Sequence, residues 1–212
     1  MAARIVTIAQ QKGGAGKTTL AIHLAMAWCL AGKRVATVDI DPQGSMTEWH
    51  RTRMASLTNG EAGPEHVQLS GWRVQKEVER LAKENEVVVI DSPPHAETEA
   101  KIAVRCASLV VVPVQPSPMD LWATRPTLEL AKAEKRKVLL VLNRVPSRGN
   151  LVDTVSSKAA ELGVPVADAT IGNRIGFAGA IMEGLTLMET ERRAKGVEEI
   201  EELAAEIWKR AG

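Results

Sequence analysis

Short runs of branched apolar residues alternate with longer amphipathic stretches along the whole chain. Near-continuous Val, Ile and Leu, without polar alternation, is typical of strands that are buried on both faces, as in a parallel sheet. The apolar runs predict strands at Ile5–Ala9, Val35–Asp39, Val87–Asp91, Leu109–Val114, Val138–Asn143 and Val164–Ala167.

The stretches between these runs carry apolar residues at helical spacing. They predict helices at Lys17–Ala31, Val74–Glu84, Glu97–Cys106, Leu121–Lys135, Val152–Leu162, Gly176–Glu183 and Val197–Arg210. The alternation predicts an α/β fold: a single doubly wound domain over residues 1–212, with a mostly parallel β-sheet and helices on both faces. Two glycines and a proline indicate a surface loop at Asn59–Glu65.

Bulk composition narrows the class of protein. The chain has 212 residues, of which 45% are hydrophobic and 25% charged, and its formal net charge is +1. A net charge so small provides no global field toward nucleic acid or membranes, so any such binding must come from a local patch. The first predicted strand begins at once, without a basic and apolar leader, and no long apolar stretch follows. We therefore expect a cytoplasmic protein.

A glycine-rich loop, Gln-Gln-Lys-Gly-Gly-Ala-Gly-Lys-Thr-Thr at residues 10–19, joins the first strand to the first helix. This order is the context in which a P-loop holds phosphate, because glycines let backbone N–H groups close around the anion. Lys17 would then reach the β- and γ-phosphates, and the Thr18 hydroxyl would ligate Mg²⁺. The alternative is a chance match in a turn rich in Gly and Lys. Gln11 stands in place of the usual first glycine, and Lys12 opens the loop.

Three aspartates follow predicted strands and should meet at the same edge of the sheet. Asp91 ends the run Val-Val-Val-Ile-Asp, which is the Walker B arrangement of a metal-binding carboxylate. Asp39 and Asp41 alternate along another strand end, so they point the same way. One could serve the metal while the other orients water. The alternatives are a helix cap for Asp91 and an Asx turn before Pro42 for the other two.

Four segments carry a resemblance to a known family. Residues 12–18 resemble the deviant Walker A motif of the ParA/MinD family of P-loop ATPases, and residues 38–45 are similar to its second acidic motif. Residues 89–94 resemble its Walker B motif, and residues 112–120 are similar to a loop of small ParA/ParF-type partition ATPases. The resemblance covers essentially the whole chain, and the first three motifs together are highly specific.

The resemblance implies ATP and Mg²⁺ as cofactors and a homodimer that sandwiches the nucleotide. Lys12 resembles the signature lysine that reaches the partner's phosphates, and Asp41 resembles the residue that positions the attacking water. Asp39 and Asp91, with Thr18, look like the metal shell. The implied nucleotide contacts are Lys12, Gly13, Gly14, Ala15, Gly16, Lys17, Thr18, Thr19 and Asn143.

Asn143 is similar to the residue that reads the adenine edge. A turn residue at the end of a strand is an equally good interpretation of its position.

The partition branch of the family implies a function in positioning. Such an ATPase dimerises on ATP, binds DNA without sequence preference, and is released when a ParB-like or other cargo adaptor stimulates hydrolysis. The chain would then be associated with the nucleoid, and its cargo would be a plasmid, a chromosome or a protein cluster. DNA contacts need Lys and Arg on the surface, for which the candidates are Lys132, Lys135, Arg136, Lys137, Arg174, Arg192, Arg193 and Lys195. Each group could also be an ordinary solvated face.

Other branches of the family fit less well. A MinD-like regulator would need a basic amphipathic tail, whereas Val197–Arg210 carries a net charge of minus three, from five glutamates, one lysine and one arginine. We therefore expect a packed terminal helix and no membrane partner. The glycine loop begins at residue 12, which leaves no room for an N-terminal helix-turn-helix. A MinD-like spatial regulator, or a slow nucleotide-dependent scaffold that acts through protein partners, stays as an alternative.

Overall fold

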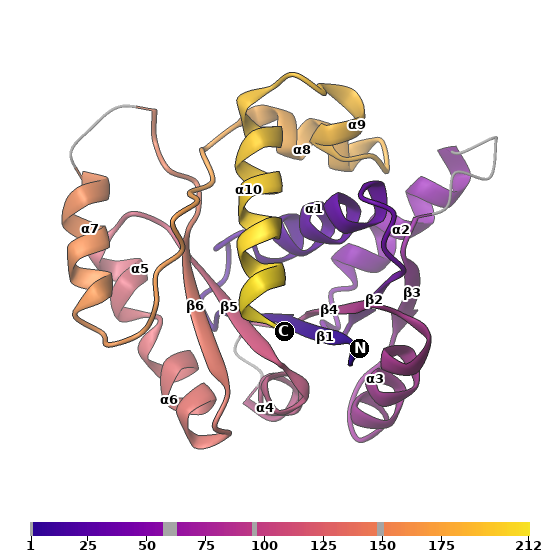
Figure 1. The fold of residues 1–212 in the computed structure, drawn as a ribbon, viewed down its shortest axis with the longest axis horizontal. Helices are drawn as coiled ribbons and strands as arrows, with labels where there is room; N and C mark the ends of the chain where they lie inside the picture. Colours follow the sequence, from indigo (N-terminus) through magenta and orange to yellow (C-terminus); the bar gives the residue numbers. More distant parts are fainter. Residues whose placement is uncertain (1, 57–62, 95–96, 148–150) are drawn as a thin grey trace.

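Six parallel strands form the centre of the molecule, in the order β3-β2-β4-β1-β5-β6 (Figure 1). The computed structural model describes residues 2–56, 63–94, 97–147 and 151–212. The strands are β1 Arg4–Ile8, β2 Val35–Asp39, β3 Glu65–Gln68, β4 Val87–Asp91, β5 Leu109–Val114 and β6 Lys137–Leu142. The predicted fold class, a doubly wound parallel sheet, is confirmed.

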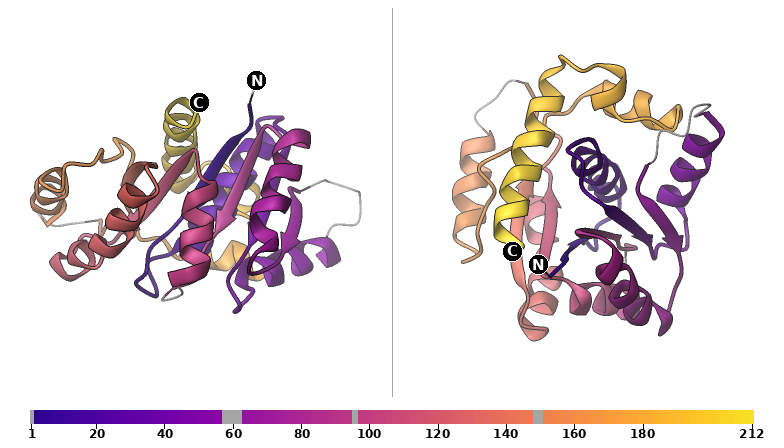
Figure 2. Two further views of the ribbon diagram at one scale, coloured as in Figure 1. Left: turned by 90° about the horizontal axis from the view of Figure 1, so that it is seen from below. Right: turned by 45° about the vertical axis from the view of Figure 1, so that its right-hand side comes forward.

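Helices cover both faces of the sheet, as Figure 2 shows from two directions. One face packs against α1 (Lys17–Leu30), α2 (Ser45–Ser56), α8 (Ile175–Met182), α9 (Leu187–Thr190) and α10 (Lys195–Arg210). The other face packs against α3 (Arg73–Glu84), α4 (Glu97–Cys106), α5 (Pro118–Trp122), α6 (Arg125–Ala133) and α7 (Leu151–Ala160).

The core follows from the composition of the strands. All five residues of β4 are at most 1% exposed, as expected for a central strand with helices on both sides. Val87 and Val89 join the core under α1, while Val88 and Ile90 join the core under α3. Successive side chains thus serve opposite faces, which is why the run is apolar throughout.

The C-terminal helix α10 packs as the sequence predicts. Val197, Ile200, Leu203 and Ile207 form a buried stripe that lies on α1, while its glutamates face outward or pair locally. The indole N–H of Trp28 on α1 donates to the carbonyl of residue 204 at 3.3 Å. The two chain termini lie side by side (Figure 1), and Arg4 Nε donates to the carbonyl of residue 208 at 2.9 Å.

The prediction of a strand at Val164–Ala167 is wrong. This segment runs beside β6 but makes only an isolated parallel bridge between Leu140 and Val166. Pro165 supplies no N–H for a ladder, although its carbonyl accepts from the Leu140 N–H at 2.9 Å. The sixth strand is instead β3 at the opposite end of the sheet.

The predicted helix Leu121–Lys135 is two helices. α5 ends at Trp122, and α6 begins at Arg125 with Pro126 in its first turn. A proline inside a continuous helix would clash with the carbonyl of Trp122, four residues earlier, so the chain breaks there. The Thr124 hydroxyl covers part of the break by donating to the carbonyl of Leu121 at 2.6 Å.

Three short elements were not predicted: α2, β3 and α9. Residues 59–62 of the predicted loop Asn59–Glu65 lie outside the described residues, and its last residue, Glu65, begins β3. The buried positions of α2 are Met46, Trp49 and Arg53. This is a helical spacing, but an arginine at one core position hides it.

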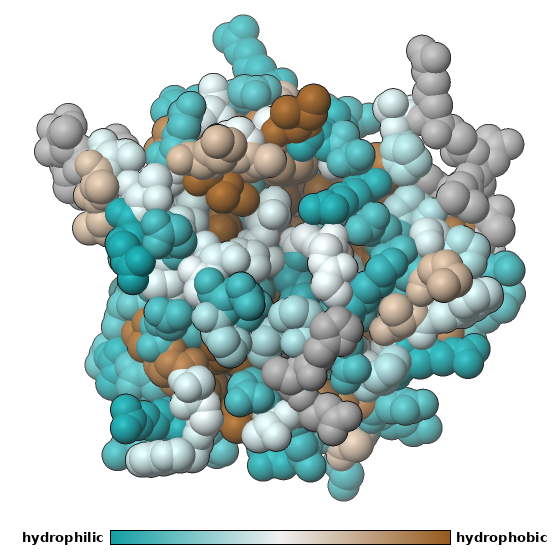
Figure 3. All heavy atoms as spheres, turned by 180° about the vertical axis from the view of Figure 1, so that it is seen from behind, coloured by the Kyte–Doolittle hydropathy of each residue, from teal (hydrophilic) through white to brown (hydrophobic). Residues whose placement is uncertain are grey.

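The face shown in Figure 3 is mostly polar, with separate hydrophobic patches. Within the described part of the chain, every helix is too short or too polar to cross a bilayer. The ends of β2 and β4 are in register, with Asp39 opposite Asp91, and β1 lies next to β4. Their carboxyl ends therefore share one edge of the sheet, which carries the candidate site.

Candidate functional site

The glycine loop follows β1 and ends on the first turn of α1. Gly16 is the N-cap of α1 with φ 84° and ψ 25°, in the left-handed region that favours glycine, and no side chain caps the helix. A Cβ on Gly16 would also lie 2.6 Å from the Asn143 amide nitrogen. Free backbone N–H groups and the helix dipole make such a terminus an anion site.

Two side chains from neighbouring strand ends hold the loop in place. Gln115, which follows β5, donates from Nε2 to the carbonyl of Gly14 at 3.0 Å. Asn143, which follows β6, donates from Nδ2 to the carbonyl of Ala15 at 2.8 Å. The loop geometry is thus set by the sheet edge as well as by its own glycines.

Thr18 and Asp91 meet beneath the loop. The Thr18 hydroxyl donates to Asp91 Oδ2 at 2.6 Å. The other oxygen, Oδ1, is buried and has no hydrogen-bond partner among the described residues. Burial raises the pKa of Asp91 to about 7, against the effect of the Thr18 hydrogen bond. A buried carboxylate oxygen without a partner is costly, and a divalent cation would satisfy it.

Lys17 lies on the same side of the site and is only 7% exposed. Burial lowers the pKa of its ammonium, and the charges of Asp91 and Asp41 act in the opposite direction. A buried ammonium at the first residue of α1, directly after the glycine loop, is suited to contact a phosphate bound there.

Asp39 is held quite differently from Asp91. Its Oδ2 accepts from the backbone N–H of Thr47 at 2.9 Å and from the Thr47 hydroxyl at 2.8 Å. Its Oδ1 accepts from the N–H of Asp41 at 3.1 Å. Burial raises the pKa of Asp39, and the Thr47 and Asp41 hydrogen bonds oppose that effect. Both oxygens are therefore engaged by the chain itself, and they fix the turn between β2 and α2.

That turn carries Asp41, which is 9% exposed at the edge of the site. Asp41 Oδ1 accepts from the N–H of Gln43 at 2.9 Å, and its carbonyl accepts from the N–H of Gly44 at 2.9 Å. The Asx geometry expected before Pro42 is present. This turn orients the Asp41 carboxylate, whose charge acts on Lys17.

Lys12, the other lysine of the loop, pairs with a carboxylate on α5. Its Nζ lies 2.9 Å from Asp120 Oδ2 on α5, and its side chain is 40% exposed, whereas that of Asp120 is 7% exposed. The sequence did not predict several residues of the site: Asp120, Gln115, Thr47, and His66 and Thr37, which are linked to Thr47 by hydrogen bonds. Asp120 and Gln115 lie in the segment 112–120 that carries a family resemblance, which was the available signal.

A cavity of about 250 Å³ opens beside the loop, between the start of α1 and the segment 171–178. Its lining includes Gly16, Leu20, Asn143, Ile171 and Phe177, which make it largely apolar. Asn143 faces it, but its amide group is used by the loop, and its Oδ1 accepts from the N–H of Arg144 at 3.0 Å. The role of Asn143 at the adenine edge stays a prediction.

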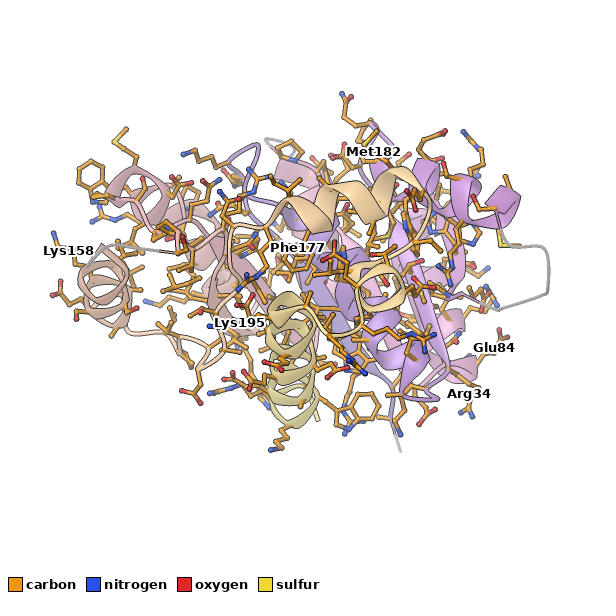
Figure 4. The ribbon with its side chains drawn as sticks, turned by 90° about the horizontal axis from the view of Figure 1, so that it is seen from above. Arg34, Glu84, Lys158, Phe177, Met182 and Lys195 are labelled. Carbon is orange, nitrogen blue, oxygen red and sulfur yellow. The ribbon has the colours of Figure 1, made fainter. Side chains whose placement is uncertain are left out.

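The candidate DNA residues form two separate groups. Lys132, Lys135, Arg136 and Lys137 are exposed between the end of α6 and the start of β6, and Lys137 Nζ donates to the carbonyl of Arg210, the last residue of α10, at 3.5 Å. Arg192, Arg193 and Lys195 are exposed near the beginning of α10, which Lys195 marks in Figure 4. The 16 residues of α10 place Lys137 and the second group at opposite ends of a helix about 24 Å long.

Arg174 belongs to neither group, because it forms an ion pair with Glu199 beside the cavity. Its role in DNA binding, like that of the two exposed groups, stays a prediction.

Comparison with known proteins identifies the family. A model of the CobQ/CobB/MinD/ParA nucleotide-binding domain matches residues 6–187. The chain belongs to this family. The match includes the glycine loop, all three aspartates and all of the sheet except the first two residues of β1.

Two relatives are named maintenance of carboxysome distribution protein A. That of Halothiobacillus neapolitanus is 29% identical, covering 95% of each chain. That of Gloeobacter kilaueensis is 32% identical, covering 93% of this chain and 89% of the relative. Among solved structures, cobyrinic acid a,c-diamide synthase from Mycobacterium smegmatis, with a bound ATP analogue and magnesium, has a TM-score of 0.78 at 21% identity. That match covers 96% of this chain and 93% of the synthase chain, and it shows a shared fold.

Proposed function

We propose that the chain binds ATP with Mg²⁺ at the carboxyl edge of the sheet and hydrolyses it to ADP and phosphate. The carrying observation is the buried, unpartnered Oδ1 of Asp91, beside the Thr18 hydroxyl at the start of α1. The synthase of the same fold, which holds an ATP analogue and magnesium, supports the choice of ligand. Asp91 and Thr18 would hold the cation, which neutralises charge on the phosphates when bound.

The other side chains of the site take complementary roles in this proposal. The loop amides and Lys17 bind the phosphates, and the Asp41 carboxylate, oriented by its Asx turn, orients the attacking water. The apolar cavity beside Gly16 and Phe177 accommodates the base. Asp39 contributes by holding Asp41 in place, because its two oxygens are already used by Thr47 and Asp41.

Lys12 completes the site of a second copy. In the single chain its half-exposed ammonium pairs with Asp120 on α5. We propose that it leaves Asp120 and reaches the nucleotide of a partner chain in an ATP-bound homodimer. A cation that arrives only on dimerisation would couple hydrolysis to assembly, as an arginine finger does.

The biological role we propose is ATP-dependent positioning of a cargo. The dimer would bind DNA without sequence preference at the nucleoid, and an adaptor on the cargo would stimulate hydrolysis and release. Two relatives are named for maintaining carboxysome distribution, which favours a large protein assembly as the cargo. Plasmid or chromosome segregation is the second possibility, since other relatives are named ParA and Soj.

The test of the dimer compares Lys12→Gln with Lys101→Gln, an exposed lysine on α4 that also has a carboxylate partner. With Lys12→Gln we expect unchanged binding of ATP to the monomer but loss of turnover that rises with protein concentration. Lys101→Gln should behave as wild type in both assays. Wild-type turnover of Lys12→Gln would refute the role in the partner's site.

The test of DNA binding is a gel shift on random duplex DNA, with and without ATP, over a series of salt concentrations. Reversing the charges of Arg192 and Arg193, or of Lys132 and Lys135, asks which exposed group binds the DNA phosphates. A group that binds them should show a flatter salt dependence after the reversal, because fewer counterions are then released. The double variant Arg51→Glu and Lys76→Glu, at exposed positions on α2 and α3, is the control for the same change of net charge. Binding that ignores both ATP and salt would contradict the proposal.

A further inference from the structure

Behind the Asp39 carboxylate lies a chain of hydrogen bonds that ends on β3. His66, the second residue of β3, is half-buried, with Nε2 3.0 Å from the Thr47 hydroxyl and Nδ1 3.0 Å from the Thr37 hydroxyl. Thr47 in turn makes its two bonds to Asp39. The imidazole therefore connects the terminal strand of the sheet to the carboxylate that fixes the Asp41 turn.

The direction of these bonds follows from what each group can do. An ionised carboxylate only accepts, so in one arrangement the Thr47 hydroxyl donates to Asp39 and accepts from His66. His66 then carries its proton on Nε2, and its Nδ1 accepts from the Thr37 hydroxyl. In this arrangement every donor of the chain has an acceptor, from Thr37 through His66 and Thr47 to Asp39.

The other tautomer gives a second complete arrangement. The Thr37 hydroxyl can instead donate to the carbonyl of Glu65, which lies 3.3 Å away. His66 would then donate from Nδ1 to the Thr37 hydroxyl, and its unprotonated Nε2 would accept a hydrogen bond from the Thr47 hydroxyl. Asp39 would lose its hydroxyl donor and keep only backbone donors. The ring position is the same in both, so the two states differ only in where three protons sit.

We propose that His66 is a positioning residue for the proposed hydrolysis. Its Nε2–H donates to the Thr47 hydroxyl, which keeps that hydroxyl donating to Asp39 and so fixes the turn that carries Asp41. This inference rests on the proposed function for its kinetic consequence. The charged acceptor makes the Nε2–H state the stable one, because hydrogen bonds to an ionised group are stronger.

Neighbouring contacts support a positioning role for β3. The ring of His50 on α2 stacks on His66 with centroids 4.7 Å apart and 24° between the planes. The amide of Gln68, also on β3, lies so near Gly44 that a Cβ there would be 2.9 Å away. Gly44 has φ +64° and ends the Asp41 turn, so β3 contacts that turn at a second point.

The first test needs neither ATP nor turnover. Nitrogen NMR of the four histidines, with His66 assigned by His66→Gln, should show His66 neutral and protonated at Nε2. Asp39→Asn should move His66 toward the Nδ1–H tautomer, whereas Asp120→Asn, on α5, should leave it unchanged. An Nδ1–H ring in the wild type, or a ring that ignores Asp39→Asn, would overturn the proposal.

The second test replaces His66 by two amide side chains, each of which places its nitrogen at the position of one ring nitrogen. The amide nitrogen of His66→Gln occupies the place of Nε2 and can still donate to Thr47, while that of His66→Asn reaches only the place of Nδ1. We expect kcat to fall about tenfold in His66→Asn with KM unchanged, as for the removal of one hydrogen bond. His66→Gln should restore it, and thermal unfolding checks that both variants fold.

Equal kcat values for the two variants would overturn the positioning role. If the wild type does not hydrolyse ATP, the proposed function fails, and the NMR experiment still decides the hydrogen-bond chain.

Discussion

Asp39 and Asp91 end neighbouring strands at the same register, yet the protein holds their carboxylates in opposite ways. Among the described residues, Asp91 receives one hydrogen bond and its buried Oδ1 receives none, whereas Asp39 receives three, which engage both of its oxygens. The bare oxygen suits a ligand that arrives later, and the satisfied carboxylate suits a fixed framework. Two identical residues at equivalent positions therefore differ in their donors: the donor to Asp91 lies on α1, and those to Asp39 lie on α2 and in the turn before it.

The largest expected effect separates the two residues by activity. Asp91→Asn should lower kcat by at least about a hundredfold, because it removes the charge that would face the cation. Binding of nucleotide without Mg²⁺ should change little. A steady-state ATPase assay over a Mg²⁺ series checks this, and near-wild-type turnover would show that the bare oxygen has no role in catalysis.

The second prediction concerns the pH dependence of stability. The pKa of Asp91 is about 7 in the folded protein and 3.8 without its surroundings, so between these values the folded state holds a proton that the unfolded chain has released. The contribution of Asp91 to the free energy of unfolding therefore falls as pH rises from about 4 to about 7, by up to about 1.4 kcal/mol per pH unit. Urea unfolding without Mg²⁺ should show this fall, and Asp91→Asn should flatten it. An unchanged slope in the variant would exclude Asp91 as its source.

The third prediction concerns stability, where we expect the substitution of Asp39 to have a larger effect than that of Asp91. Asp39→Asn places an amide group against N–H or O–H donors, and we expect the free energy of unfolding to fall by about 2 kcal/mol. Asp91→Asn should cost less, because it alters an oxygen that has no partner among the described residues. Urea unfolding of both variants at one pH above about 7.5 makes the comparison, since the Asp91 carboxyl is then mostly ionised in both states. Equal costs would show that the two carboxylates contribute alike to stability.

The smallest effect belongs to the hydroxyl behind Asp39. Thr47→Val keeps the backbone donor to Asp39 but removes the hydroxyl donor, and should cost about 1 kcal/mol in the free energy of unfolding. Thr52→Val on the same helix is the matched control, since its hydroxyl only bonds the carbonyl of Glu48 on the exposed side. A cost no larger than that of the control would show that the hydroxyl contributes nothing.

The parts of the site on regular, apolar elements were predictable from the sequence. The glycine loop, Asp91 and Asp39 follow buried strands, and the periodicity that predicts those strands also places their ends together. β3 was not predictable in this way, because Glu65, His66 and Gln68 give a terminal strand no apolar pattern. α2 has a core arginine, Arg53, paired with Glu189, and a polar core position breaks the helical signal.

The hydrogen-bond partners of the site were the least predictable part. Thr47 and His66 are 19 residues apart and belong to the two elements that were missed, so their contact with each other could not be anticipated. Lys12 was predicted to act in a partner's site, and its pairing with Asp120 within one chain needed coordinates. Contacts between side chains from separate elements depend on packing angles that periodicity does not report.

The place of β3 in the sheet has a consequence for dynamics. β3 is the last strand in the order and pairs with β2, whereas β4 lies between two strands. Terminal strands open by local unfolding at a lower free energy than central ones, and their amides exchange hydrogen sooner. The support of Asp39 therefore stands on one of the more easily opened strands of the sheet, whereas Asp91 itself ends one of the most protected strands.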